Sequence, residues 1–452
     1  MSETFEIADI EPSIETPLGK PQSVKPALLT DSLSYFASKI VPGLMGLISV
    51  PIFIRLIGLD EYGRFAVIVP FLMAVAGASS GWLAQGILRF HPVAADPHDR
   101  QAAFDRAVTA GTVASVLGTS LILAAVLSGL HYRFFTALVS LAFCLSLLVY
   151  TVALFRLQAK LRPMSVLRRE ILRSTAGFLI PVLIVIITGR KHFELIVLGQ
   201  ALAYTIALVP VFGWRSQSKE RIPQVAKALP PVSSTGSTIH QLWRFGWAVG
   251  LWLLLSQALP VIDRWTIQRF TSFQSAGIYA SLYEIAIRSF SFLAFPLTQA
   301  AHPRIMRAWN EGNFAESYRI IRYSIGSQFA IFGIVLGGVS LFAHRITKII
   351  LGFDDPAAAR MLPVLLVGGF LWQLALLIHK PLEIAQRTGA MLAAMAVVVA
   401  LNVIACFVLI PRFGYEAASY ILVFSACAYI ALTLVMTRFR ALRRFSEAAE
   451  AC

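Results

Sequence analysis

The feature that most constrains this fold is a series of long apolar runs, spaced along almost the whole chain. A helix needs about 20 largely apolar residues to cross a bilayer, and about 12 runs meet that length. Charged residues make up only 14% of the chain, against about 25% in soluble domains. The sequence therefore predicts an all-α membrane protein of about 12 transmembrane helices. The runs cover residues 30–55, 66–89, 107–130, 134–155, 172–189, 193–213, 243–268, 276–300, 322–343, 361–379, 389–410 and 417–437.

A short motif occurs once in each half of the chain. It consists of an Arg, a Gly eight positions later, and then an aromatic residue followed by Ala. The two copies are Arg55, Gly63, Phe65 and Ala66, and Arg269, Gly277, Tyr279 and Ala280. A His-Pro pair follows the next apolar run in each half, at His91 and at His302. Such repetition at a near-constant offset indicates a duplicated unit, and duplicated membrane bundles are typical of carriers.

The least apolar break falls between the sixth and seventh runs and predicts two six-helix lobes. We expect a disordered tail at 1–27, lobes at 28–214 and 241–438, a linker at 215–240 and a second tail at 439–452. An even number of helices per lobe makes this a parallel repeat, with its axis along the membrane normal. Lys and Arg concentrate in the connections on the side of the termini, which predicts that both termini are cytoplasmic.

Composition also bears on the function class. The net charge of +15 could suggest a nucleic-acid partner, but the basic residues lie between the apolar runs, where membrane topology explains them. We therefore expect no nucleic acid. The four cysteines have no spacing typical of metal ligands or of a disulfide framework, and no motif of a cofactor site or a catalytic nucleophile is present. A transporter without covalent chemistry is favoured over an enzyme.

Polar side chains within the membrane are concentrated in the first, second, seventh and eighth runs, which are equivalent under the repeat. In the eighth run they form one stripe at steps of three and four: Gly277, Ser281, Glu284, Arg288 and Ser291. A charge at mid-membrane costs at least about 2.5–3.5 kcal/mol unless it meets water or a partner. Glu284 precedes Arg288 by four residues, the spacing of a helical ion pair. These four helices are predicted to line a central cavity.

The expected cavity is cationic, because its basic side chains outnumber its acids. Guanidinium groups are suited to phosphate oxygens, so an anionic, phosphate-bearing ligand is predicted. Three alternatives remain open. Arg89, near a span end, could only snorkel to the interface, and Glu284 with Arg288 could be a structural pair. Asp263 with Arg264 could be an anchor at the outer edge of the membrane. The candidate substrate-binding residues are Lys39, Arg89, Arg264, Arg288 and Gln257; the candidates for ion coupling are Asp263 and Glu284.

Four segments resemble the polysaccharide transporter (Wzx-like flippase) family of the multidrug/oligosaccharidyl-lipid/polysaccharide exporter superfamily. They are PIFIRLIGLDEYGRFAV (51–67), DRWTIQRFTSFQSAGIYA (263–280), HPRIMRAWNEGN (302–313) and IPRFGYEAASY (410–420). The resemblance implies a V-shaped bundle that alternates between two openings and moves undecaprenyl-pyrophosphate-linked oligosaccharide across a bacterial inner membrane. It also implies cavity cations at Lys39, Arg89, Arg264 and Arg288. The family often has Gly-Ala-Ala after the Phe-Gly of the last segment, where this chain has Tyr415-Glu416-Ala417-Ala418.

We therefore expect a flippase for an O-antigen or exopolysaccharide unit. Its partners would be the lipid-linked oligosaccharide, membrane lipids and the polymerase and glycosyltransferases of the same pathway. No cofactor is expected beyond a proton or sodium gradient. The alternatives are an ion-coupled multidrug or metabolite antiporter, a lipid II flippase, and a membrane-embedded glycan polymerase or ligase. The short external connections argue against the last, since such enzymes tend to carry a large external loop.

Overall fold

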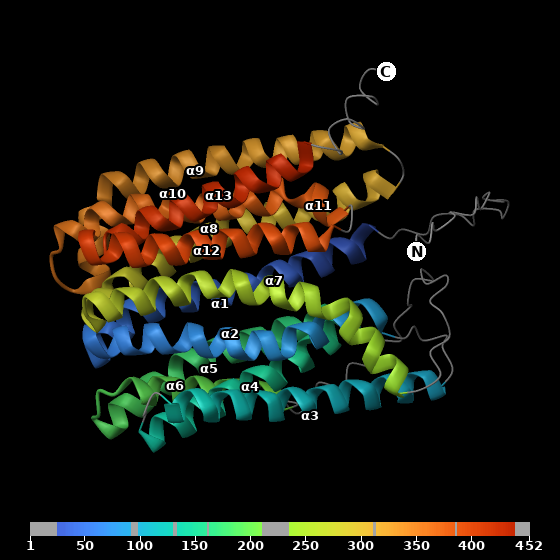
Figure 1. Ribbon diagram of the computed structural model, residues 1–452, viewed down its shortest axis with the longest axis horizontal. Helices are drawn as coiled ribbons and strands as arrows, with labels where there is room; N and C mark the ends of the chain where they lie inside the picture. The colour runs from blue at the N-terminus through green and yellow to red at the C-terminus, as the bar shows by residue number, and fades with distance from the viewer. Residues whose placement is uncertain are drawn as a thin grey trace, which may run out of the picture.

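The computed structural model describes residues 25–91, 98–129, 133–160, 162–209, 235–310, 313–384 and 387–438. Within these ranges the secondary structure is entirely helical (Figure 1). The helices are α1 (Lys25–Ile57), α2 (Leu59–Phe90), α3 (His98–Gly129), α4 (Phe134–Ala159), α5 (Pro163–Thr188), α6 (Phe193–Leu208), α7 (Thr235–Phe270), α8 (Phe273–Asn310), α9 (Phe314–Leu351), α10 (Pro356–Ile378), α11 (Lys380–Ile384), α12 (Thr388–Phe413) and α13 (Ala417–Arg438).

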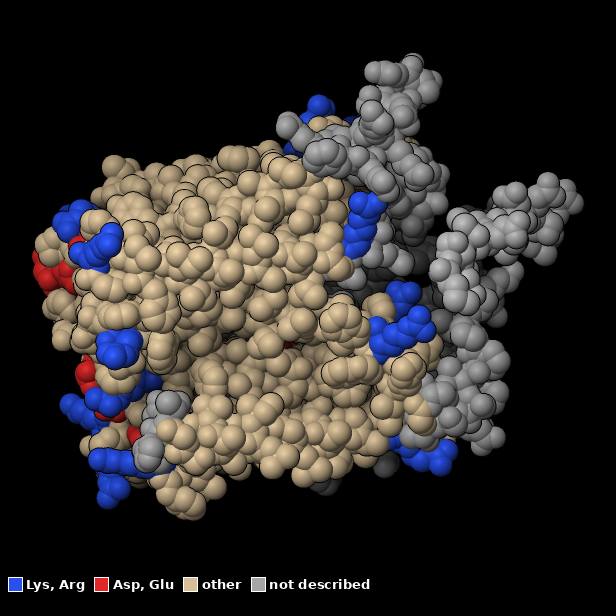
Figure 2. Space-filling view, in the orientation of Figure 1, with Lys and Arg blue, Asp and Glu red and all other residues tan. Residues whose placement is uncertain are grey.

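Each predicted apolar run falls on its own long helix, and α11 is a five-residue turn between two of them. Nine helices of the described residues are long and apolar enough to cross a membrane, and Val41–Ile57 and Phe193–Leu208 are shorter apolar helices. On the face in Figure 2, charged residues gather at the two ends and leave a broad central band almost free of them. The chain is a multi-pass membrane protein, and the predicted all-α fold class is confirmed.

Helix ends were predicted less well than helix positions. α7 begins at Thr235, so the last residues of the linker predicted at 215–240 are helical. The apolar run marks only the part of a helix that suits lipid, and polar turns can extend it into water. α1 likewise begins at Lys25, within the predicted 1–27 tail. The remaining tail and linker residues, 1–24, 215–234 and 439–452, lie outside the described residues, so their predicted disorder stays a prediction.

The helices lie roughly parallel and form two groups (Figure 1). In the first group, α5 packs on α1 and α6, and α4 packs on α2 and α6. In the second, α8 packs on α9 and α10, α13 packs on α10 and α12, and α12 packs on α7. α1 begins and α13 ends at the same end of the bundle, on the right in Figure 1, which we call the terminal end. The opposite end carries the α1–α2 and α7–α8 connections and is called the loop end.

The two groups meet chiefly where α2 packs along α7 and α8, and where α1 packs against α8. Small residues allow this close approach. A Cβ on Gly246 would collide with the Trp82 backbone, and a Cβ on Gly86 would lie 2.7 Å from the Leu242 side chain. These positions lie in the part of α2 and α7 nearest the terminal end. Glycine allows such helices to approach to backbone contact, as in other membrane bundles.

The repeated motif forms a second close contact between the groups, at the loop end. A Cβ on Gly63 of α2 would collide with the Phe273 carbonyl of α8, and a Cβ on Gly277 would lie 2.7 Å from the Leu59 carbonyl oxygen. Leu59 precedes Gly63 by four residues, as Phe273 precedes Gly277. The contact is therefore reciprocal, which is the geometry of an isologous interface on a two-fold axis. We call this contact the glycine crossing.

Candidate functional site

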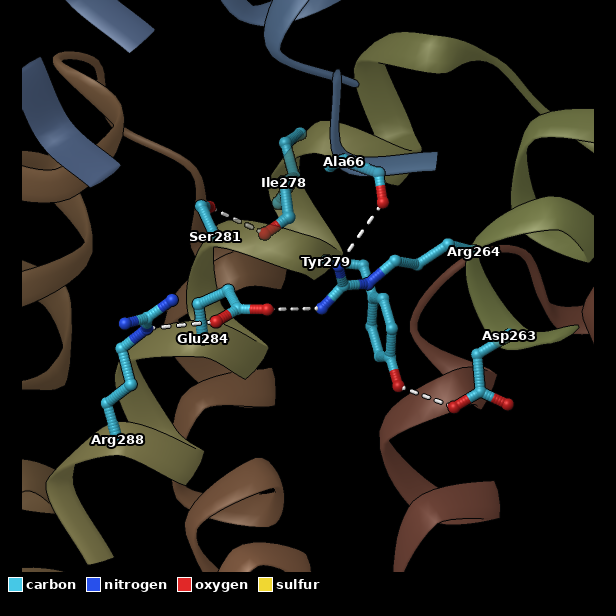
Figure 3. Close-up of polar contacts among 8 residues, drawn as sticks. All are labelled: Ala66, Asp263, Arg264, Ile278, Tyr279, Ser281, Glu284 and Arg288. Carbon is cyan, nitrogen blue, oxygen red and sulfur yellow. Dashed lines mark hydrogen bonds and ion pairs between the residues drawn. The ribbon is translucent and has the colours of Figure 1, made fainter. Parts of the chain in front are cut away.

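Three charged side chains from α7 and α8 form an ion-pair cluster between the two groups of helices. Glu284 accepts hydrogen bonds from Arg264 Nη2 at 2.8 Å and from Arg288 Nε at 2.9 Å, one on each carboxylate oxygen (Figure 3). The predicted ion pair between Glu284 and Arg288 is confirmed, but the carboxylate is shared with a second arginine that the spacing did not indicate. We call Arg264, Glu284 and Arg288 the charged cluster.

Arg264 connects the two groups of helices. Its Nη1 donates to the Ala66 carbonyl oxygen of α2 at 3.2 Å, and its guanidinium carbon lies 5.1 Å from the centre of the Tyr283 ring. Only 3% of its side chain is exposed. A buried guanidinium requires a carboxylate partner and further hydrogen-bond acceptors, and Arg264 has both. Its position links the charge of α8 to the backbone of α2.

Arg288 is the accessible member of the charged cluster, with 38% of its side chain exposed against 27% for Glu284. Among the described residues, its one hydrogen bond runs from Nε to Glu284. Its guanidinium lies directly against α1 at Gly46, where a Cβ would collide with Nη1. Arg288 lies 15 residues after the start of α8, about 22 Å along the helix at about 1.5 Å per residue. It is therefore deep in the bundle.

Asp263 precedes Arg264 in the chain but faces the other way, toward α8 and α12 (Figure 3). Tyr279 Oη donates to it at 2.8 Å, Asn402 Nδ2 at 3.1 Å and Cys406 Sγ at 3.3 Å. Asn402 Nδ2 also lies 3.2 Å from Ser425 Oγ of α13. Asp263 is 1% exposed, so it is a buried carboxylate held by neutral donors. We call Asp263, Tyr279, Asn402 and Cys406 the neutral-donor cluster.

Two further predicted site residues, Arg89 and Gln257, do not join these clusters in the structure. Arg89 is exposed at the last turn of α2, where it stacks over Phe90 and Phe245, so its position fits the alternative of a snorkelling side chain. Gln257 is exposed on α7. Lys39 lies within α1, but its side chain lies outside the described residues. Their assignment to the substrate site stays a prediction, and so does the central cavity.

Sequence reasoning missed part of both clusters. Asn402 was not among the predicted site residues, because the carboxylate that it contacts, Asp263, lies far away in the sequence. Cys406 gave no signal at all. Gly46 was not among the predicted site residues either, although a glycine at this position leaves space for the Arg288 guanidinium. Contacts between distant helices were the missing information in each case.

The charged cluster is suited to an anionic ligand. Two guanidinium groups face one carboxylate, so the cluster keeps one net positive charge. The accessible guanidinium, that of Arg288, belongs to the residue farther along its helix from the loop end. A phosphate or pyrophosphate could take the exposed edge of Arg288 without disturbing Arg264. The neutral-donor cluster is suited instead to a small cation or a proton, because its carboxylate has no hydrogen-bonded cation among the described residues.

Solved structures with this arrangement of helices are membrane transporters. The lipid II flippase MurJ in an inward closed conformation superposes with a TM-score of 0.65 at 12% identity, over 91% of this chain and 87% of that one. An inward-facing multidrug resistance MATE family transporter of the MOP superfamily gives a TM-score of 0.63 at 14% identity, over 92% and 99%. The MATE multidrug transporter DinF-BH gives 0.61 at 14% identity, over 92% and 96%. The chain therefore has the MOP-superfamily transporter fold.

The family is shown by sequence. The chain belongs to the polysaccharide biosynthesis protein family, whose model matches residues 28–309. This range includes the first group of helices and α7 and α8, and so includes the whole charged cluster. No curated protein sequence matches the chain significantly. The resemblance found in the sequence motifs is thus confirmed at the level of the family, and the fold is one that MOP-superfamily transporters share.

Proposed function

We propose that this protein is a flippase that moves undecaprenyl-pyrophosphate-linked oligosaccharide across the inner membrane of a bacterium, with both termini in the cytoplasm. The observation that carries the proposal is the exposed guanidinium of Arg288, held deep in the bundle beside Glu284. Polysaccharide biosynthesis requires the export of sugar units made on a phosphate-bearing lipid. The family and the cationic site both fit that substrate.

The pyrophosphate is the group that Arg288 would bind. A guanidinium offers several donors in a plane, and its bonds to phosphate are stronger than those between neutral groups. Because Glu284 also holds Arg264, the arrival of an anion at Arg288 would leave Glu284 neutralised by Arg264. The sugar needs polar surroundings, since its hydroxyl groups are costly to place unpaired in lipid. The polyprenyl chain would stay in the bilayer.

Ion coupling is assigned to Asp263 rather than to Glu284. Glu284 already has two cationic partners, whereas Asp263 accepts only from neutral groups among the described residues. Proton or sodium binding at Asp263 would change the charge of α7 next to Arg264. That change could be transmitted to the contact of Arg264 with Ala66, which joins the two groups of helices.

The test is export in cells that carry Arg288→Ala. Loss of the guanidinium should cause glycan-linked undecaprenyl carrier to build up on the cytoplasmic face and should lower surface polysaccharide at least tenfold. Arg269→Ala is the matched control, because Arg269 is also exposed but stacks over the Phe270 ring at the end of α7. It should leave export near the wild-type level.

Normal surface polysaccharide in the Arg288→Ala strain, with the protein inserted in the membrane, would refute this function. If the wild-type protein extrudes cationic drugs, and the lipid carrier does not change the rate of extrusion, the multidrug antiporter would be favoured instead. A requirement for growth with accumulation of lipid II would favour a lipid II flippase. Incorporation of sugar into polymer by the purified protein would favour the polymerase or ligase.

A further inference from the structure

Three side chains at the loop end converge outside both the charged cluster and the neutral-donor cluster. Glu61 lies in the first turn of α2, His192 directly precedes α6, and Glu194 lies in the first turn of α6. One ligand atom from each lies within 4.8 Å of the ligand atoms of the other two. We propose that Glu61, His192 and Glu194 form a binding site for a divalent transition-metal ion such as Zn²⁺.

The two carboxylates are held in place by contacts behind them. Glu61 Oε2 accepts the backbone N–H of Phe193 at 2.8 Å, and Glu194 Oε1 accepts the hydroxyl of Thr136 at 2.9 Å. Thr136 is 3% exposed, so this second contact is fixed in the protein interior at the start of α4. Such outer contacts orient metal ligands in known sites and strengthen their binding. The site is therefore built from three helices of the first group.

The local charge leaves room for a cation. Arg64 Nε lies 3.1 Å from Asp60 and 3.3 Å from Glu61, so its one positive charge is divided between two carboxylates. Among the described residues, no basic side chain forms an ion pair with Glu194. An acid in the first turn of a helix is ordinarily explained by the helix dipole. The dipole explains each glutamate separately, but it does not explain why both meet at one imidazole.

The ligand set indicates the class of metal. Imidazole favours zinc and other late first-row ions, and one imidazole with two carboxylates leaves a position for water. Mg²⁺ prefers oxygen ligands alone and retains its waters, so it is a poor fit. Glu61 lies two residues before Gly63, so a metal ion here would fix the start of α2 beside the glycine crossing.

The experiment is zinc binding by the purified full-length protein in detergent, measured by competition with a chromophoric chelator and by metal analysis after dialysis. Wild type should bind one Zn²⁺ per chain. His192→Ala and Glu194→Gln should abolish this binding, and Thr136→Val should weaken it by about 10–100-fold. His344→Ala is the matched control: His344 is also exposed at the loop end and pairs with Asp354 at 2.9 Å.

Thermal unfolding without metal separates loss of binding from loss of fold. His192→Ala should unfold at the wild-type temperature, because the side chain is exposed. Added Zn²⁺ should raise the unfolding temperature of wild type and of His344→Ala but not that of His192→Ala. The proposal is overturned if wild type binds no Zn²⁺, if His192→Ala binds as well as wild type, or if His344→Ala loses the ion. None of these outcomes depends on whether the protein exports a glycan.

Discussion

The charged cluster and the neutral-donor cluster begin at adjacent residues of α7 and yet have opposite partners. Arg264 shares Glu284 with Arg288, so charge is balanced by charge between α7 and α8, and the Arg264 hydrogen bond to Ala66 crosses to α2 in the other group. Asp263 faces α8 and α12, where hydroxyl, amide and thiol groups surround it. α7 thus contributes a buried cation to one cluster and a buried carboxylate to the other, from two residues that are one peptide bond apart.

The largest expected effect follows from removing the residue that joins the helix groups. Arg264→Ala takes one partner from a buried ion pair and leaves the Ala66 carbonyl without its donor. Breaking such pairs costs about 3–5 kcal/mol of the free energy of unfolding, and we expect about 3 kcal/mol because Glu284 keeps Arg288. Chemical unfolding in detergent measures this value. Arg269→Ala, an exposed arginine on the same helix, should change it by less than about 0.5 kcal/mol.

An Arg264→Ala protein as stable as Arg269→Ala would mean that the charged cluster does not hold the two groups together. The charged cluster and the neutral-donor cluster would then be two unrelated polar sites.

Asp263→Asn tests the other side of α7. The amide keeps an acceptor for Tyr279 but cannot accept from every donor that now surrounds the carboxylate, so we expect a loss of about 1.5–3 kcal/mol. Transport by proteoliposomes should also stop responding to an imposed proton or sodium gradient. Glu284→Gln is the comparison, and it should keep the gradient response while lowering transport. A gradient response that survives Asp263→Asn would remove Asp263 from coupling.

Gly63→Ala tests the contact that covers the charged cluster on the side of the loop end. The added methyl group must push α2 away from the Phe273 carbonyl, at a cost of about 1–3 kcal/mol. The lobes should separate at the loop end, and spin-label distances across that end should lengthen. Gly77→Ala on the same helix meets nothing within 4 Å and should leave the distances unchanged. Equal distances in both variants would show that the crossing does not close this end.

Gly46→Ala should have the smallest effect on stability. The new methyl group meets only the guanidinium of Arg288, which can swing away, and alanine is the better helix former by about 1 kcal/mol. Stability should therefore change little, whereas export should fall several-fold because Arg288 no longer lies against α1. Unchanged export would mean that Arg288 does not act from its present position.

The apolar runs predicted the helices, because lipid imposes length and hydropathy on each span separately. The ion pair of Glu284 with Arg288 was predictable for a similar reason, since both residues lie on one helix. Arg264 and Asn402 were not predictable in their observed roles, because their partners lie on other helices and depend on how the lobes pack. Arg89 lies among aromatic rings at a span end, and its place in the substrate site stays a prediction.

The glycine crossing has a consequence for the history of the chain. Gly63 and Gly277 occupy matching positions in the two copies of the motif, and each packs against the segment of the other copy. Each copy therefore limits the size of the side chain that the other can carry at its glycine position. A larger residue in either half would be resisted by its own counterpart. This mutual restraint offers a reason why the residues around these two glycines still show an ancient duplication. The rest of the chain retains little trace of it.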